Sequence, residues 1–91
     1  MFRYKTSVPL PYDRQGYIYF WLLNYPLLPQ RQQERIRRVC REVGGEDYAA
    51  ALQEFLTTDR GGTAVCMAHH LSRSTLWRYV RRAYVRFDRE I

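Results

Sequence analysis

The sequence predicts an all-α fold, a small bundle of four to five helices in which residues 1–91 form a single domain. Two long stretches place apolar side chains at the spacing of one helix face, and the second half of the chain contains no strand–turn–strand pattern. The two apolar stripes consist of Ile36, Val39, Cys40 and Val43, and of Leu76, Val80, Ala83 and Phe87. A chain of this length buries a modest fraction of its surface, so its core is marginal without a partner or a second copy.

The aromatic N-terminal segment, residues 1–28, is the least regular part of the chain. Residues 1–13 contain two prolines and are expected to be extended and irregular. Residues 14–25 have a helical pattern, although their aromatic density also suits a strand; we expect a short helix that ends at Pro26. The helical pattern consists of Ile18, Trp21, Leu22 and Tyr25.

Residues 29–57 are expected to form two supporting helices. Pro29 suits the first turn of the first helix, and Gly44 and Gly45 supply its C-terminal stop. The second helix, EDYAAALQEFLTT, begins with two acidic residues, which favour the positive end of a helix dipole. Its apolar face consists of Tyr48, Leu52, Phe55 and Leu56.

Residues 61–90 have the pattern of a helix-turn-helix, in which two helices are joined by a very short connection. The first helix is expected over residues 63–70, and the second begins after Ser72, a good N-cap, and ends near residue 88. Leu71 would enter the core at the turn. This arrangement would hold one face of the second helix away from the core and available to the major groove of DNA.

The stretch VCMAHHLSRSTLWRYVRRAYVRF resembles the promoter-reading helix-turn-helix of bacterial sigma factors. It resembles still more the small phage transcriptional regulators of the RinA/ArpU type. The matching positions are Val65, Leu71, Ser72, Thr75, Leu76, Val80, Arg82, Ala83 and Phe87. The resemblance implies a sequence-specific DNA-binding transcriptional regulator of phage or mobile-element origin.

Three positions depart from that family pattern. Cys66 stands where alanine is preferred, and His69 stands where a core leucine is expected. His70 stands where glycine commonly opens the turn, so it would have to adopt a backbone conformation that is uncommon for a bulky residue.

The charge of the chain favours a polyanionic partner. The net charge is +6, and every cation except Lys5 is arginine, whose planar fork binds phosphate. We expect four residues to read base edges: Arg73, Ser74, Trp77 and Arg78. We expect four others to bind phosphates: Ser72, Arg81, Arg82 and Arg86. The alternatives are an arginine-rich composition that reflects a GC-rich genome, and an ordinary surface helix with solvated arginines.

The sequence supports a metal site or a catalytic site less well than it supports DNA binding. Cys40, Cys66, His69 and His70 lack the two tight ligand pairs that a structural zinc site shows. Serines lie near the two histidines in sequence, but no acid completes a triad and no glycine-rich phosphate loop follows a strand. We therefore expect no metal, no cofactor, no catalytic residue and no enzymatic activity.

The remaining expectations concern partners and location. The aromatic N-terminal segment either completes the core or forms an interface with a second copy or with RNA polymerase. A non-enzymatic protein-interaction adaptor that uses this segment is the main rival function, and an RNA binder with the same basic face is another. The longest apolar run, YIYFWLL, is too short to span a bilayer and no signal peptide is visible, so we expect a cytoplasmic protein without a membrane partner.

Overall fold

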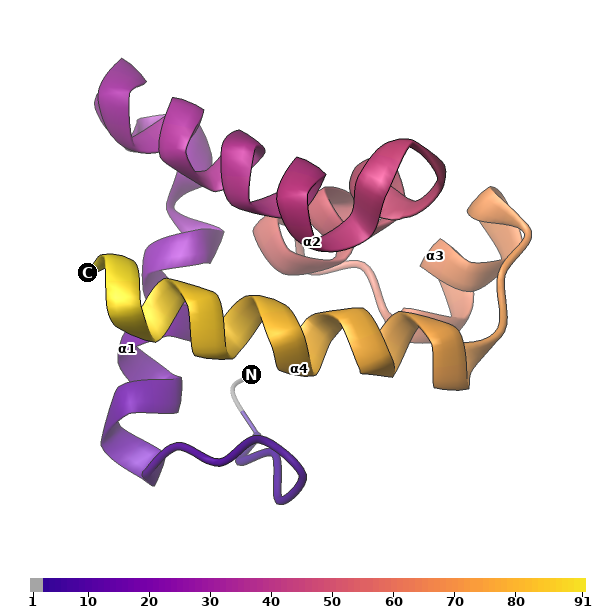
Figure 1. Cartoon of the computed structure of the whole chain (residues 1–91), viewed down its shortest axis with the longest axis horizontal. Helices are drawn as coiled ribbons and strands as arrows, with labels where there is room; N and C mark the ends of the chain where they lie inside the picture. The colour runs from indigo at the N-terminus through magenta and orange to yellow at the C-terminus, as the bar shows by residue number, and fades with distance from the viewer. Residues whose placement is uncertain (1–2) are drawn as a thin grey trace.

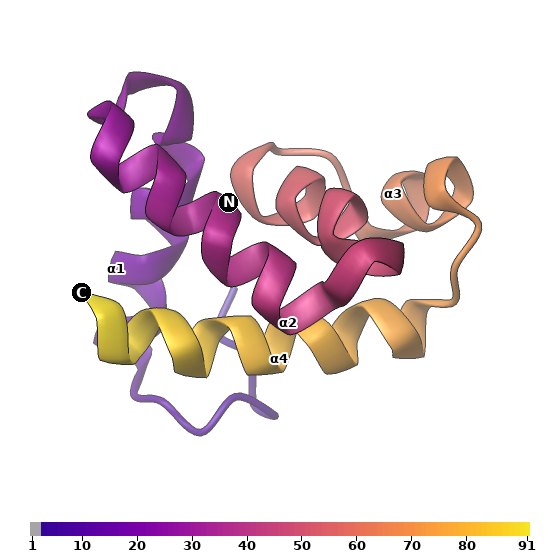
Figure 2. The same cartoon turned by 45° about the horizontal axis from the view of Figure 1, so that its top comes forward.

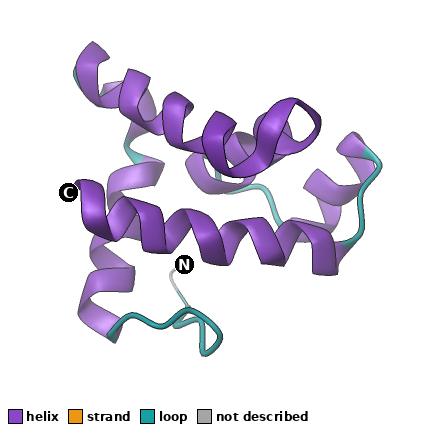
Figure 3. Cartoon of the chain, in the orientation of Figure 1, coloured by secondary structure: helices purple, strands orange, loops and turns teal. Residues whose placement is uncertain are grey.

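Helices account for nearly all of the regular structure in the computed structural model, which describes residues 3–91 (Figure 1). In chain order, the elements are α1 (Tyr12–Leu23), the short 3₁₀ helix η1 (Tyr25–Leu27), α2 (Gln30–Thr57), α3 (Gly62–His69) and α4 (Arg73–Glu90). Residues 3–91 contain no strand (Figure 3). The all-α fold that the sequence predicts is therefore confirmed.

The irregular segment before α1 is organised by one buried amide side chain. Gln15, in the first turns of α1, is completely buried. Its Oε1 accepts a hydrogen bond from the backbone N–H of Lys5 at 2.8 Å, and its Nε2 lies 3.0–3.3 Å from the carbonyl oxygens of Lys5, Val8 and Leu10. A buried amide is tolerated only when its polar atoms are paired, and here the pairing fixes the path of the N-terminal segment.

α2 consists of two helical pieces that meet at the paired glycines. Gly45 has φ 66° and ψ −170°, a conformation essentially restricted to glycine, and the helix changes direction there. Gly44 is required for a different reason, because a Cβ on it would lie 2.9 Å from the backbone nitrogen of Ala49. The break falls at the glycine pair where the sequence indicates a helix stop.

α4 lies along the body of the molecule and packs against each of the other α-helices (Figures 1 and 2). Its inner face is buried along its length by Leu76, Val80, Ala83, Tyr84 and Phe87. Trp21 of α1 meets Phe87 edge to face, with ring centroids 5.6 Å apart. Phe55 of α2 meets Trp77 in the same way at 5.7 Å. These contacts hold α4 between α1 at its C-terminal end and the second half of α2 near its N-terminal end.

The two cysteines belong to this core. Cys40 and Cys66 are both free and buried, in α2 and α3 respectively. Burial raises the pKa of the Cys40 thiol to about 12. Separately, none of the helices within residues 3–91 combines the length and apolar character needed to cross a membrane.

Candidate nucleic-acid interface

The connection between α3 and α4 turns tightly through a left-handed residue. His70 has φ 56° and ψ 49°, and it is the residue that follows the last helical position of α3. The N–H groups of His70 and Leu71 both donate to the carbonyl oxygen of Cys66, which caps the end of α3. Leu71 is half-buried against the core, as expected for the turn. A non-glycine residue therefore occupies the position where glycine is commonly preferred.

Ser72 begins α4 as its N-cap. Its Oγ accepts a hydrogen bond from the backbone N–H of Thr75 at 3.1 Å and donates to the Thr75 hydroxyl at 2.9 Å. This is the cap that the sequence indicates. Because the hydroxyl is engaged in capping, a phosphate contact at this position would draw on the exposed backbone at the start of α4.

The residues expected to read bases divide into two groups. Arg73, Ser74 and Arg78 are exposed on the N-terminal half of α4. Trp77 is half-buried, because its indole packs edge to face on Phe55. Trp77 therefore lies at the flank of the outer face, and the three polar residues form its exposed part.

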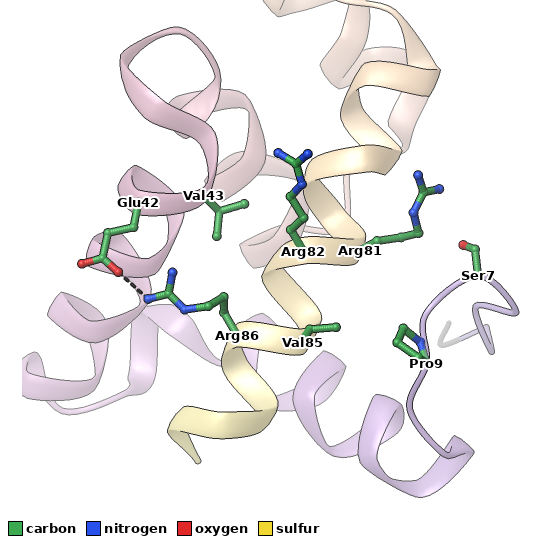
Figure 4. Close-up of a pocket in the computed structure, with 8 residues that line it drawn as sticks. All are labelled: Ser7, Pro9, Glu42, Val43, Arg81, Arg82, Val85 and Arg86. Carbon is green, nitrogen blue, oxygen red and sulfur yellow. Dashed lines mark hydrogen bonds and ion pairs between the residues drawn. The ribbon is translucent and has the colours of Figure 1, made fainter.

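Three of the four residues expected to bind phosphate line a shallow hollow over α4, and these are Arg81, Arg82 and Arg86 (Figure 4). Ser72 lies away from it, at the start of α4. The hollow has a volume of about 510 Å³. It lies between the N-terminal segment on one side and the end of the first piece of α2 on the other (Figure 4). Its lining residues are Ser7, Pro9, Glu42, Val43, Arg81, Arg82, Val85 and Arg86.

One arginine of this hollow has an internal partner. Arg86 forms an ion pair with the Glu42 carboxylate, which Arg38 also approaches at 3.5 Å (Figure 4). The hydrogen bond from Arg86 lowers the pKa of Glu42 below its ordinary value, and the nearby charges of Arg86 and Arg38 add to this effect. Arg86 is thus not available to a phosphate unless it leaves Glu42.

The other arginines of α4 differ in this respect. Of the six arginines in the helix, Arg86 alone forms an ion pair or side-chain hydrogen bond with the residues that the structure describes. The remaining five are Arg73, Arg78, Arg81, Arg82 and Arg89. Elsewhere in the molecule, Arg14, Arg35, Arg38 and Arg60 each pair with a carboxylate. Arg31, Arg37 and Arg41 of α2 also have no carboxylate partner among the described residues, but α4 carries the larger number of such arginines.

Sequence reasoning missed two members of this face. By helical spacing, Arg78, Arg82, Val85 and Arg89 lie on one line opposite the buried stripe. Arg89 is exposed and continues the row of arginines toward the C-terminus, and Val85 is the apolar residue within that row. The signal that could have found both was the same i, i+4, i+7, i+11 spacing that identified the inner face.

His69 has a partner that the sequence did not reveal. Its Nε2 lies 3.0 Å from Oε1 of Glu54, whose carboxylate also pairs with Arg60. The hydrogen bond with His69 lowers the pKa of Glu54, and the charges of Arg60 and His69 act in the same direction. Within residues 3–91, no serine hydroxyl hydrogen-bonds to His69 and no group of three or more candidate ligands is placed to hold a metal ion. The pair ties the end of α3 to α2.

Compared with the other helices, α4 is distinguished by the number of arginines on its outer face and by the exposure of most of these side chains. No family model, curated protein or solved structure matches this chain. Its function is accordingly inferred from the side chains on α4 and from how the other helices hold them.

Proposed function

We propose that the protein is a sequence-specific DNA-binding transcriptional regulator in which α3 and α4 form a helix-turn-helix. The observation that supports this most directly is the row of arginines on the outer face of α4, none of which has a carboxylate partner among the described residues. Arginines that serve only solubility are commonly interspersed with carboxylates of opposite charge, and Arg35 and Arg38 of α2 pair with such groups here. A surface of unpaired arginines on one helix suits a polyanion.

The N-terminal half of α4 is the part proposed to enter the major groove. α1 and the C-terminus lie at the other end of α4, and among the described helices α3 and the second piece of α2 lie beside the N-terminal half (Figures 1 and 2). The major groove is about 12 Å wide and admits an α-helix. Arg73, Ser74 and Arg78 would face base edges there, and the exposed edge of Trp77 would lie beside them.

The second half of α4 would hold the phosphate backbone. Arg81 and Arg82 line the hollow without a carboxylate partner, and Arg89 extends the row. Arg86 would join them by exchanging Glu42 for a phosphate. The split between base-reading and phosphate-binding residues follows the usual division in which phosphate contacts position a protein and base contacts specify the site.

The finer features of this role follow from the resemblance to sigma-factor and RinA/ArpU-type regulators. A protein of this kind would act on double-stranded DNA in the cytoplasm, and RNA polymerase is a candidate partner. Binding would require no cofactor and no catalytic group, so we propose that the protein is not an enzyme.

The first test is a salt titration of binding to duplex DNA. If about five phosphates are neutralised, the log–log slope of the association constant against salt should be about −4 to −5. Arg82→Ala should make that slope shallower by about 1, and Arg78→Ala should cost about 1–3 kcal/mol at a cognate site and relax specificity there. Arg31→Ala is the matched control, because it removes the same charge from an exposed position on α2. Equal losses of DNA affinity in all three variants, or no duplex binding at low salt, would contradict the proposal that α4 binds DNA.

The second test is selection of bound DNA from a random pool. Enrichment of a sequence that Arg78→Ala no longer prefers would support base reading by α4. Failure to enrich any sequence would favour the protein-interaction adaptor. Stronger retention of single-stranded than of double-stranded competitors would favour an RNA binder instead.

A further inference from the structure

The outer face of α1 is an exposed aromatic surface at the end of the molecule remote from α3 (Figure 1). Tyr12, Tyr17 and Phe20 are 61%, 57% and 56% exposed. They surround a hollow of about 590 Å³. Its lining residues are Tyr12, Asp13, Gly16, Tyr17, Phe20, Trp21 and Asn24. Large apolar side chains gathered on one face of a small domain mark an interaction surface more often than a solvated one.

We propose that this α1 face is the contact between two copies of the chain, which pair through a two-fold axis near Gly16. A two-fold contact requires a patch that is complementary to itself. Tyr12, Gly16 and Phe20 are spaced four residues apart, so they lie near one another along the exposed side of the helix. An antiparallel second α1 would place Tyr12 against Phe20 of the other copy at both ends. Gly16, which has no side chain, would let the two backbones approach at the centre.

Charge favours a second copy over a charged partner. The protein carries a net charge of +6, so two copies repel each other wherever their arginines face. Among the described residues, the hollow on α1 is lined by no arginine or lysine and by one carboxylate, Asp13. Arg14, the arginine of α1, is directed to the C-terminal end of α4, where its Nε lies 2.6 Å from Asp88. The Arg14 guanidinium lies 5.4 Å from the centre of the Tyr17 ring, but its charge is paired with Asp88. Among the described residues, the face therefore presents no cation that lacks a carboxylate partner, so two basic molecules can meet there.

The area is adequate for a weak dimer. An aromatic side chain buries roughly 150–250 Å² when fully covered, so these three exposed rings present roughly 250–450 Å² per copy. Two copies would bury roughly 500–900 Å² through the rings alone. The other lining residues bring the total toward the ~1,000 Å² that a specific interface needs. Association should therefore depend strongly on concentration.

Sedimentation velocity of the full chain without DNA tests the pairing, over loading concentrations of about 10 µM to 1 mM. The weight-average mass should rise from 11.0 kDa toward twice that value. Phe20→Arg and Tyr17→Arg should each raise the dimer Kd at least about tenfold, and circular dichroism should show that both remain helical. Leu27→Arg is the matched control, because it places the same charge on an 84% exposed apolar residue outside the hollow and should leave the Kd unchanged.

Disulfide trapping tests the antiparallel register separately. Gly16→Cys should form an intermolecular disulfide under mild oxidation, because the two positions meet at the axis. Asn24→Cys should not, because an antiparallel pair centred on Gly16 separates its two copies by about 24 Å along the helices. A chain that stays monomeric at every concentration would overturn the proposal. So would disulfide formation at position 24 rather than 16, or an equal loss of dimer from Leu27→Arg. DNA binding plays no part in these measurements, so their outcome is independent of the proposed function.

Discussion

Replacing His70 by glycine should stabilise the protein. His70 holds the left-handed conformation, φ 56° and ψ 49°, at the turn between α3 and α4. Its side chain is exposed and makes no hydrogen bond with the described part of the chain, so its removal breaks no polar contact. The substitution isolates one quantity, the cost of forcing a residue with a Cβ into this conformation.

The expected gain follows from two opposing effects. A residue with a Cβ pays roughly 1–2 kcal/mol to occupy the left-handed region, and glycine avoids this cost. Glycine also gives the unfolded chain more freedom, which returns about 0.5–1 kcal/mol of the gain. The net increase in the free energy of unfolding should be about 0.5–1 kcal/mol, which for a domain of this size raises the Tm by about 2–8 °C.

Thermal and urea unfolding followed by circular dichroism would measure this gain. His70→Ala is the matched control, because it removes the imidazole but keeps the Cβ, and its stability should stay close to that of the native chain. His70→Val should be the least stable variant, since a β-branched residue tolerates a positive φ poorly. If His70→Gly is no more stable than His70→Ala, residue 70 is not left-handed, and the turn that positions α4 is different from the one described.

Other expectations address the helix break, the ion pair and the core. Gly45→Ala should lower the free energy of unfolding by about 1–3 kcal/mol, because Gly45 has a positive φ. Gly62→Ala is the control and should not lower it, because the added Cβ would make only ordinary contacts. Equal effects of the two substitutions would contradict the positive φ of Gly45. Glu42→Gln should release Arg86, strengthen duplex binding and steepen its salt slope by about 1, and an unchanged slope would show that Arg86 does not reach phosphate. Arg86 lowers the pKa of Glu42 in the folded state, so the stabilisation from this pair should be complete above the unfolded-state pKa of 4.5. It should be lost as the pH falls through the lower folded-state pKa. The urea midpoint of Glu42→Gln should therefore fall less on acidification than that of the native protein. The Cys40 thiol should resist alkylation at pH 8 in the folded protein and react once urea unfolds it.

Local patterns account for the parts of the fold that the sequence predicts well. The apolar stripe of α4 is buried as its spacing indicates, because an amphipathic helix can only satisfy that stripe by turning it inward. Ser72 caps α4, and the chain breaks at Gly45, because capping and positive φ are properties of one or two residues and their neighbours. Such features depend on few residues and are visible without knowledge of the tertiary structure.

Contacts between distant parts of the chain account for what the sequence did not reveal. The pairing of Arg86 with Glu42 joins residues 44 positions apart, and it exists only because α4 packs along α2. The role of Gln15 in holding the N-terminal segment likewise depends on a chain path that no local pattern specifies. The partner of His69 is a third case, since Glu54 lies on another helix.

The outer face of α4 shows how a single buried residue changes a functional interpretation. The inner stripe read from the sequence ends with Ala83 and Phe87, but Tyr84 is also buried, with the Lys5 ammonium 5.0 Å from its ring centre. Burying Tyr84 widens the inner face toward Trp77, which lies seven residues earlier on the same side of the helix. The centre of the outer face therefore moves away from Trp77 and toward Arg78. Arg78 is both an expected base-reading residue and a member of the row opposite the core, so its substitution is the most informative single change for DNA recognition.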